Sequence, residues 1–296
     1  MSEETLQNQE SIFPRPYVFL GVGLLLLALL LQLGLSASQN SITWDEDNHI
    51  YSGYMSWKTL DFGLNPEHPP LVKAVASLPL LWMDLKLPAM EDRDFKFQGF
   101  LGGKDFLFKN PADTMLFRAR MAASIFALLL ALLVFLAAKE MFGTTAGLVS
   151  LALLVFDPNL VAHGPVVATD AALSCFFFAT VYGFYRYVKA PSLGRAALVG
   201  LSGGLALASK HTAILLLPIL LIIALVEIFR GRPSVGQPID ETSSQRAKRI
   251  AGTFLLLSAV AVGILWAFYG FRYGARPAPL QLNPPFAELE SAAEPV

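Results

Sequence analysis

The amino-acid sequence predicts an all-α integral membrane protein with about seven transmembrane helices and a large first loop that carries interfacial helices. Two observations predict this class. Of the 296 residues, 54% are hydrophobic and only 15% are charged, whereas soluble domains average about 25% charged residues. The apolar residues also form long runs separated by short polar stretches, which is typical of membrane spans rather than of one globular core.

The first apolar run covers residues 17–36 and contains no charged residue. About 20 residues at a rise of 1.5 Å each are enough to cross a hydrocarbon core of roughly 30 Å. The alternative is a cleaved signal peptide, and the sequence after the run leaves room for cleavage. However, the preceding tail carries Glu3, Glu4 and Glu10, where a signal peptide is positively charged. We therefore expect a retained helix.

Six further apolar runs complete the predicted membrane domain, which covers residues 17–275 between a tail at 1–16 and a tail rich in proline, alanine and glutamate at 276–296. Cys175, which lies in one of these runs, is the single cysteine of the sequence. An internal disulfide is therefore impossible. The six runs are 117–138, 146–161, 166–188, 196–209, 212–229 and 250–271.

The basic residues of the short loops predict the orientation. With a cytoplasmic N-terminus, the short outside loops hold only Lys210, apart from Arg272 and Arg276 in the tail, and the inside loops hold most of the rest. Basic residues near span ends favour the cytoplasm, and loops longer than about 60 residues are exempt. The first loop, 37–116, is exempt and is predicted to be extracytoplasmic. The inside loops hold Lys139, Arg186, Lys189, Arg195, Arg230, Arg232, Arg246, Lys248 and Arg249.

The first loop itself contains two predicted helices. Residues 45–60 place Ile50, Tyr51, Tyr54 and Trp57 on one apolar side. A second stretch, 71–82, follows a Pro-Pro pair, which is acceptable in a first helical turn. At roughly 12 residues it is too short to span the membrane, so we expect it to lie at the interface. Residues 88–110 are expected to form an irregular loop.

Polar residues of several chain segments converge on the predicted outer side. Asp170 is expected about one turn inside the fourth span, and Lys210 at the outer turn between the fifth and sixth. Charges within or beside spans are costly and usually face a cavity, a partner or a substrate. The other members of this outer group are His49, His68, His163, His211, Asp45, Glu46, Glu67 and Asp157.

Each member also has a structural alternative. Asp45 fits a helix cap, with the following acids complementing the helix dipole. The stretch from Glu67 to Pro70 fits a plain turn, and Asp157 fits a break between two spans. Lys210 fits a side chain that extends to the interface. Asp170 is different, because an acid at that depth requires a partner.

The absence of certain motifs argues against several classes of function, including ATP-dependent proteins and serine hydrolases. Walker loops and nucleophile elbows of the GxSxG type are absent, and no basic face suits nucleic acid. A divalent metal is an alternative with weak support. Glu67, His163 and His211 are admissible ligands, together with His68, but no HExxH or CxxC spacing supports a site. We therefore expect no required cofactor and no assigned metal ligand.

Several motifs stand in a recognisable order. The Asp45-Glu46 pair follows the first span; then come residues 63–73 (GLNPEHPPLVK), 157–164 (DPNLVAHG), 169–170 (TD) and 204–212 (GLALASKHT). Over roughly residues 15–275 this order resembles the polyprenyl-phosphate-dependent GT-C glycosyltransferases. The group most similar is that of the dolichyl-phosphate-mannose–protein mannosyltransferases and their bacterial relatives, which include aminoarabinose transferases acting on lipid A. The acidic pair combined with EHPPL is the more specific part.

The resemblance implies a multi-pass protein of the cell (inner) membrane with an extracytoplasmic active site. It implies transfer of a sugar from a polyprenyl-phosphate donor to a hydroxyl of a protein, lipid or glycan acceptor, with inversion and without nucleic acid. Asp45 is implied as the base, with Glu46 beside it. The implied donor-binding residues are Glu67, His68, Lys73, His163, Asp170, Lys210 and His211.

One departure leaves alternatives open. Relatives usually continue with further spans and often a soluble domain, whereas this sequence ends soon after its seventh predicted span. A truncated or split enzyme is therefore one expectation. A noncatalytic scaffold or remnant is another, and a lipid or solute transporter is a third, although a transporter places its charges nearer mid-membrane.

Overall fold

The computed structural model describes residues 14–89, 94–230 and 241–285, and these form helices and connecting segments without a β-strand. Most of the predicted tail at 1–16, the inside-loop residue Arg232 and residues 286–296 of the second tail lie outside the described part. The helices are α2 (Arg15–Gln39), α3 (Glu46–Thr59), α4 (Pro70–Ser77), η1 (Leu78–Trp82), α5 (Phe95–Phe108), α6 (Ala112–Ala123), α7 (Ile125–Phe142), α8 (Thr144–Val155), α9 (Pro158–His163), α10 (Thr169–Lys189), α11 (Leu193–Ser209), η2 (His211–Leu215), α12 (Leu216–Phe229) and α13 (Ser243–Phe268).

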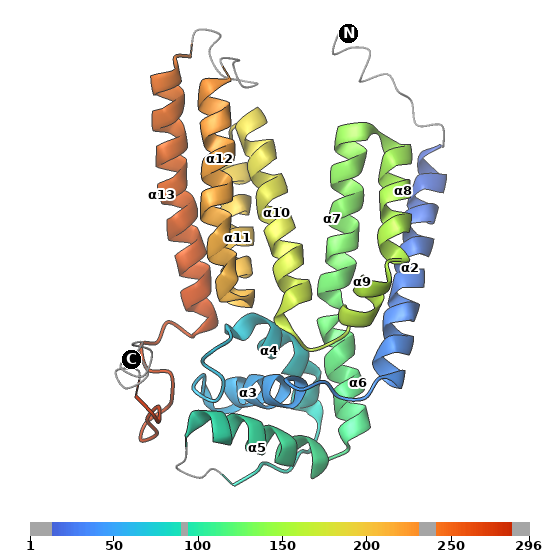
Figure 1. The fold of residues 1–296 in the computed structure, drawn as a ribbon, viewed down its shortest axis with the longest axis vertical. Helices are drawn as coiled ribbons and strands as arrows, with labels where there is room; N and C mark the ends of the chain where they lie inside the picture. Colours follow the sequence, from blue (N-terminus) through green and yellow to red (C-terminus); the bar gives the residue numbers. More distant parts are fainter. Residues whose placement is uncertain (1–13, 90–93, 231–240, 286–296) are drawn as a thin grey trace, which may run out of the picture.

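Most of the helices form a bundle, and α3, α4 and α5 form a layer at one end of it. In Figure 1 the long axes of α2, α7, α8 and α10 to α13 run roughly parallel, and α3, α4 and α5 lie across one end of this bundle. Helices α2, α7 and α8 pack around one apolar cluster that includes Leu33 and Leu151. Helices α10 to α13 pack around another that includes Phe184 and Leu257. The bundle therefore has two packed groups, which meet where α7 contacts α10.

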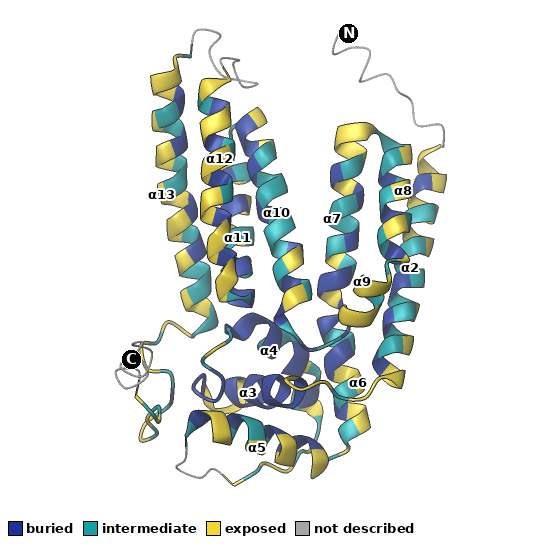
Figure 2. Ribbon diagram, viewed as in Figure 1, coloured by how far each residue is buried: buried dark blue, intermediate teal, exposed yellow. Residues whose placement is uncertain are grey.

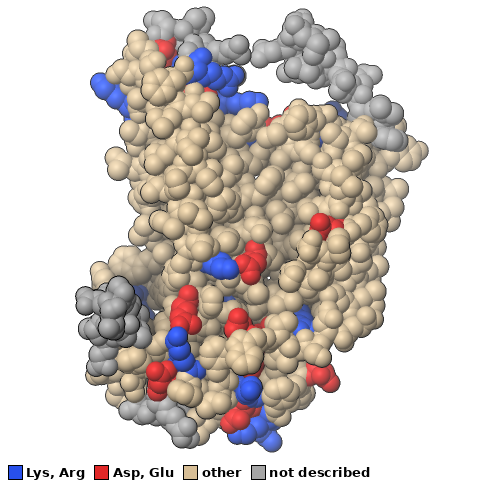
Figure 3. Space-filling model, viewed as in Figure 1, with Lys and Arg blue, Asp and Glu red and all other residues tan. Residues whose placement is uncertain are grey.

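Within the described residues, four helical stretches are long and apolar enough to cross a membrane: Arg15–Gln39, Ala112–Phe142 (α6 and α7 together), His211–Phe229 and Ser243–Phe268. Each of the seven predicted spans overlaps a helix of the bundle, but a count of seven crossings is not confirmed. The predicted span 146–161 is interrupted, because α8 ends at Val155 and α9 begins at Pro158. Figure 2 shows that α3 and α4 are mostly buried, whereas the bundle helices expose much of their surface. Figure 3 shows charged residues at one end of this face and over the half that carries the α3–α5 layer, with an uncharged belt between them. Exposed apolar sides between charged ends are what a bilayer requires of a helical bundle.

Three predicted boundaries differ from the structure. Residues 95–108 form α5, not an irregular loop. Its glycines lower helix propensity but allow close packing, since a Cβ at Gly99 would lie 2.4 Å from the Leu64 carbonyl oxygen. Residues 166–168 are not helical, so Asp170 lies in the first turn of α10 rather than one turn inside. Helix α13 starts at Ser243, seven residues before the predicted start, because Thr242 and Gln245 form a capping box there.

The helices α3 and α4 of the layer lie close to where the sequence predicts them. Helix α3 occupies almost the whole of the predicted stretch 45–60. Helix α4 begins at Pro70, with Pro69 at the N-cap, as the Pro-Pro pair indicates. An apolar cluster that includes Leu71, Val72, Phe126 and Ala208 joins α4 to α7 and α11. The layer is thereby fixed against both groups of the bundle.

Candidate active site

The two adjacent acids Asp45 and Glu46 have opposite environments. Asp45 is exposed at the N-cap position of α3, and its side chain makes no capping hydrogen bond. Glu46, one residue later, is fully buried. The capping alternative for Asp45 is therefore absent from the structure, and its carboxylate is accessible to a ligand.

The Glu46 carboxylate is held by Arg120 of α6 and by two backbone amides. Its Oε1 accepts hydrogen bonds from Arg120 Nε at 2.9 Å and from the Val167 amide at 3.0 Å. Its Oε2 accepts from Arg120 Nη2 at 2.6 Å and from the Thr43 amide at 2.9 Å. Burial raises the pKa of Glu46, but the bonds and charge of Arg120 and the two amides outweigh it, and the net pKa is lowered. Glu46 is thus an ionised group without a free acceptor direction.

Lys73 supports the turn that carries His68. Its Nζ donates to the backbone oxygens of Asn65 at 2.6 Å and of His68 at 2.7 Å. The side chain is buried, and burial lowers the pKa of Lys73 to about 7. Two carbonyls hydrogen bond an ammonium but do not neutralise it, so this lysine adds positive potential beneath the turn.

The side chains of two histidines, His49 and His68, are in contact near Lys73. The rings of His49 and His68 lie 4.9 Å apart, edge to face. Burial, with the charges of Lys73 and His68, lowers the pKa of His49 to about 3. The neutral His49 ring accepts a hydrogen bond at Nδ1 from the Asn65 amide, 3.1 Å away, which leaves its proton on Nε2. His68 is half-buried, and burial together with Lys73 lowers its pKa, whereas Asp45 and Glu67 raise it.

A second charged pair comes from the bundle. Lys210, directly after α11, donates to Asp170 Oδ1 of α10 at 2.6 Å. Lys210 is also close enough to His68 to act on its titration. His211, the next residue, is exposed and within electrostatic range of Lys73. The predicted group therefore comes together in part: Asp45, His68, Lys73, Asp170, Lys210 and His211.

Two cavities lie in the α3–α5 layer, and their linings contain none of the six residues of this group. One of about 320 Å³ is apolar and lies between α3, α4 and the end of α13, lined by residues that include Trp57, Phe62 and Phe268. The other, of about 460 Å³, lies between the start of α3 and α5 and is lined by Trp44, Phe100 and Lys104, among others. The first cavity suits an apolar chain, and the second combines aromatic side chains with the charged residues Asp47, Asp94, Lys96 and Lys104.

Other predicted residues lie apart from the group. Glu67 is exposed and pairs with Lys96 of α5 at 2.8 Å. His163 is exposed at the end of α9, a helix that packs against α2 and α8. Asp157 caps α9, since its Oδ1 accepts from the Leu160 amide at 2.9 Å, as expected of a break between spans. Within the described ranges no three His, Cys, Asp or Glu side chains cluster closely enough to hold a metal ion.

Two buried arginines, Arg120 and Arg276, were not among the residues predicted to be functional. Arg120 stood inside the predicted span 117–138, and a guanidinium in an apolar helix signals a buried acceptor. Arg276 was assigned to the tail, yet it is buried and donates to Asp61 Oδ2 from Nε at 3.2 Å and from Nη2 at 2.9 Å. A Cβ at Gly63 would lie 2.3 Å from Arg276 Cγ, so glycine is needed there. Nothing local in the sequence indicates this long-range pair.

The comparison with protein families agrees with the motifs. The model described as dolichyl-phosphate-mannose-protein mannosyltransferase matches residues 107–240. This range contains Arg120, Asp157, Asp170 and Lys210 but does not contain Asp45 or the 63–73 motif. No curated protein matches the chain. Over residues 107–240 the chain is therefore similar to the dolichyl-phosphate-mannose–protein mannosyltransferases, a family of membrane glycosyltransferases, in agreement with the resemblance that the motifs indicate.

Proposed function

We propose that this protein transfers a sugar from a polyprenyl-phosphate donor to an acceptor hydroxyl at the end of the bundle covered by α3, α4 and α5, on the extracytoplasmic side. One observation carries the proposal. His68 lies within electrostatic range of both Asp45 and Lys210, so an exposed carboxylate and a cation from distant segments lie near one half-buried turn. A transfer from a lipid phosphate needs a base on one side of the reacting carbon and cations on the other.

Asp45 is the proposed base. Its exposed carboxylate takes the proton of the acceptor hydroxyl while the hydroxyl oxygen bonds to the anomeric carbon. The bond from that carbon to the phosphate oxygen breaks, and polyprenyl phosphate leaves with the electron pair. Displacement in one step inverts the anomeric centre. Glu46 is not a second base, because Arg120 and two amides occupy its oxygens; its role is to fix the start of α3.

Lys210 and His68 are the proposed partners of the leaving phosphate. Their hydrogen-bond donors match the negative charge that develops on the phosphate oxygens. Asp170 orients the Lys210 ammonium, and Lys73 fixes the His68 backbone. The exposed His211 side chain is a further possible hydrogen-bond donor to the phosphate. The apolar cavity beside Trp57 and Phe268 suits the first isoprene units of the donor. Neither Glu67 nor His163 is part of this arrangement.

The test uses the purified chain in lipid nanodiscs with a panel of polyprenyl-phosphate sugars and a panel of acceptors that carry hydroxyl groups (peptides, lipids and glycans), and mass spectrometry follows release of polyprenyl phosphate. Asp45→Asn is expected to lower release by about 10²- to 10⁴-fold. Asp113→Asn, an exposed acid in the first turn of α6, is the matched control and should leave release unchanged.

Release that is equal in wild type and Asp45→Asn would remove Asp45 as the base. No release from folded wild-type protein with any combination of donor and acceptor would contradict a self-sufficient transferase. That outcome would favour a split enzyme or a noncatalytic scaffold.

A further inference from the structure

A second polar pocket lies at the end of the bundle away from the α3–α5 layer. Its volume is about 330 Å³, and it lies where the end of α10, the start of α11 and the first turns of α13 meet. Tyr187, Ser192, Arg249 and Thr253 supply its polar lining, and Leu193 and Leu256 border it. None of these residues belongs to the proposed active site.

Arg249 is incompletely hydrogen bonded in this pocket. Its Nε donates to Glu241 Oε1 at 3.0 Å and its Nη2 to Glu241 Oε2 at 3.3 Å. Its Nη1 is buried and has no hydrogen-bond partner among the described residues. A buried donor without an acceptor is rare, and one that carries a charge is especially unfavourable. The pocket therefore presents a charged donor that an external acceptor can satisfy.

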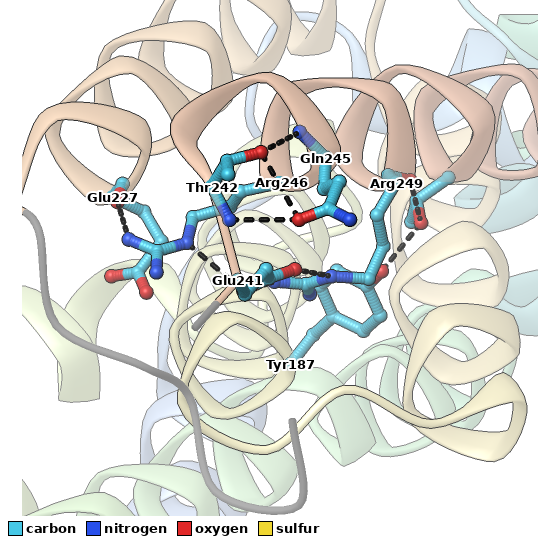
Figure 4. A network of polar contacts seen from close by, with 8 residues as sticks. Tyr187, Glu227, Glu241, Thr242, Gln245, Arg246 and Arg249 are labelled. Atoms are coloured by element: carbon cyan, nitrogen blue, oxygen red, sulfur yellow. Dashed lines mark hydrogen bonds and ion pairs between the residues drawn. The ribbon is translucent and has the colours of Figure 1, made fainter. Parts of the chain in front are cut away.

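The surrounding charge favours an anion as that acceptor. Glu241 also accepts from Arg246 Nε at 3.2 Å, so one carboxylate lies between two guanidinium groups, as Figure 4 shows. The Tyr187 hydroxyl, which also lines the pocket, is hydrogen bonded to Thr253 rather than to Arg249. The described basic residues at this end outnumber the acids Glu140, Glu227 and Glu241; they are Lys139, Arg186, Lys189, Arg195, Arg230, Arg246, Lys248 and Arg249.

The border of the pocket indicates what else the ligand contains. Leu193 is 80% exposed and Leu256 is 37% exposed, and both stand on helices of the apolar bundle. A free inorganic anion gains nothing from such a border, whereas an acyl chain buries its surface against it. Basic pockets between transmembrane helices bind the head groups of anionic lipids.

We propose that this pocket binds the phosphate head group of an anionic phospholipid, with Arg249 Nη1 donating to a phosphate oxygen and the acyl chains lying along Leu193 and Leu256. The bound lipid then bridges α10, α11 and α13, and it adds an acceptor that the protein alone does not provide. This inference is independent of the proposed transferase activity.

The experiment measures lipid binding to the delipidated full-length protein in detergent by native mass spectrometry and by thermal unfolding. The probes are phosphatidylglycerol, phosphatidylcholine and inorganic phosphate, each titrated separately. Wild type should retain phosphatidylglycerol in preference to phosphatidylcholine and should unfold at a higher temperature when it is bound.

Three variants localise the effect. Arg249→Gln should weaken phosphatidylglycerol binding by about tenfold or more, the equivalent of one charge-assisted hydrogen bond. Lys248→Gln is the matched control, because it removes the same charge from an exposed neighbour and should change binding less than about twofold. Gly252→Leu keeps every charge and fills the pocket, since a Cβ at Gly252 meets nothing within 4 Å; it should also abolish the preference.

Equal weakening by Arg249→Gln and Lys248→Gln would overturn the proposal, because binding would then follow net charge alone. Unchanged binding in Gly252→Leu would overturn it as well. A stabilisation by inorganic phosphate as large as that by phosphatidylglycerol would overturn the assignment to a lipid. If Arg249→Gln fails to fold, the contrast between Gly252→Leu and wild type decides.

Discussion

Arg120 and Glu46, 74 positions apart, form a buried ion pair in which each of the five guanidinium N–H groups has an acceptor. Glu46 takes two of them. The other three reach backbone oxygens at the end of α2 and in the segment that follows it, namely those of Ala37, Asn40 and Ser41. The Val167 amide joins the same carboxylate from the segment before α10. One pair thereby fixes the first span, the start of α3 and the approach to Asp170 around the exposed Asp45.

Removing one partner of this pair should unfold the layer. Arg120→Met leaves an uncompensated buried carboxylate, and we expect a loss of about 3–5 kcal/mol in the free energy of unfolding. Arg118→Met, an exposed neighbour on α6, should stay within about 0.5 kcal/mol of wild type. Thermal unfolding in detergent measures both variants. Equal melting temperatures for the two would show that the pair does not stabilise the fold.

A side chain at Gly53 should separate α3 from α4. A Cβ there would lie 2.1 Å from the Lys73 carbonyl oxygen, so the helices must move apart, and Gly53→Ala should cost about 1–3 kcal/mol and lower polyprenyl phosphate release. Gly23→Ala is the control, because a Cβ at Gly23 on α2 meets nothing within 4 Å; it should be neutral or stabilising by up to about 1 kcal/mol. Similar unfolding curves for the two alanine variants would contradict the close packing.

The buried Lys73 should make stability rise with pH. Its pKa is about 7 in the folded protein and 10.5 when unfolded, so between these values the unfolded chain binds more protons. The free energy of unfolding therefore increases from about pH 7 toward pH 10.5, whereas below pH 7 both states are protonated and Lys73 contributes no slope. Denaturation midpoints measured between pH 6.5 and 9.5 should lose this rise in Lys73→Met and keep it in Lys58→Met, an exposed lysine of α3. The same slope in both variants would argue against a depressed pKa of Lys73.

Lys210 should matter for turnover but little for stability. Its pair with Asp170 is solvent-accessible, so solvent screening limits its contribution to about 0–1 kcal/mol. Lys210→Met should nevertheless lower polyprenyl phosphate release by about 10- to 100-fold, because it removes a charged donor from the leaving phosphate. Asp170→Asn should have the smaller effect, because Asp170 only orients the ammonium.

The pair of Lys109 with Asp105 in α5 provides the control for Lys210. Lys109→Met removes an equivalent exposed ion pair away from His68 and should leave release unchanged. Full activity in Lys210→Met, or an equal loss in Lys109→Met, would rule out a specific role of Lys210 at the phosphate.

The sequence by itself determined the helical membrane class, the apolar segments and most of the layer. Long uncharged runs have no stable alternative to helix in a bilayer, because every backbone polar group must be satisfied internally. The Pro-Pro pair fixed the start of α4 through local geometry alone. Helix α5 escaped prediction because its glycines argue against a helix locally, whereas their packing against α3 rewards one.

The candidate site was less accessible from the sequence. Motif order put Asp45, His68 and Lys210 on one side of the bundle, but adjacency in the chain could not separate Asp45 from Glu46. Only tertiary structure decided that, because a carboxylate becomes structural when a distant guanidinium such as Arg120 reaches it. Partners more than 70 positions apart leave no local pattern, so burial and ion pairing depend on how the helices pack rather than on spacing along the chain.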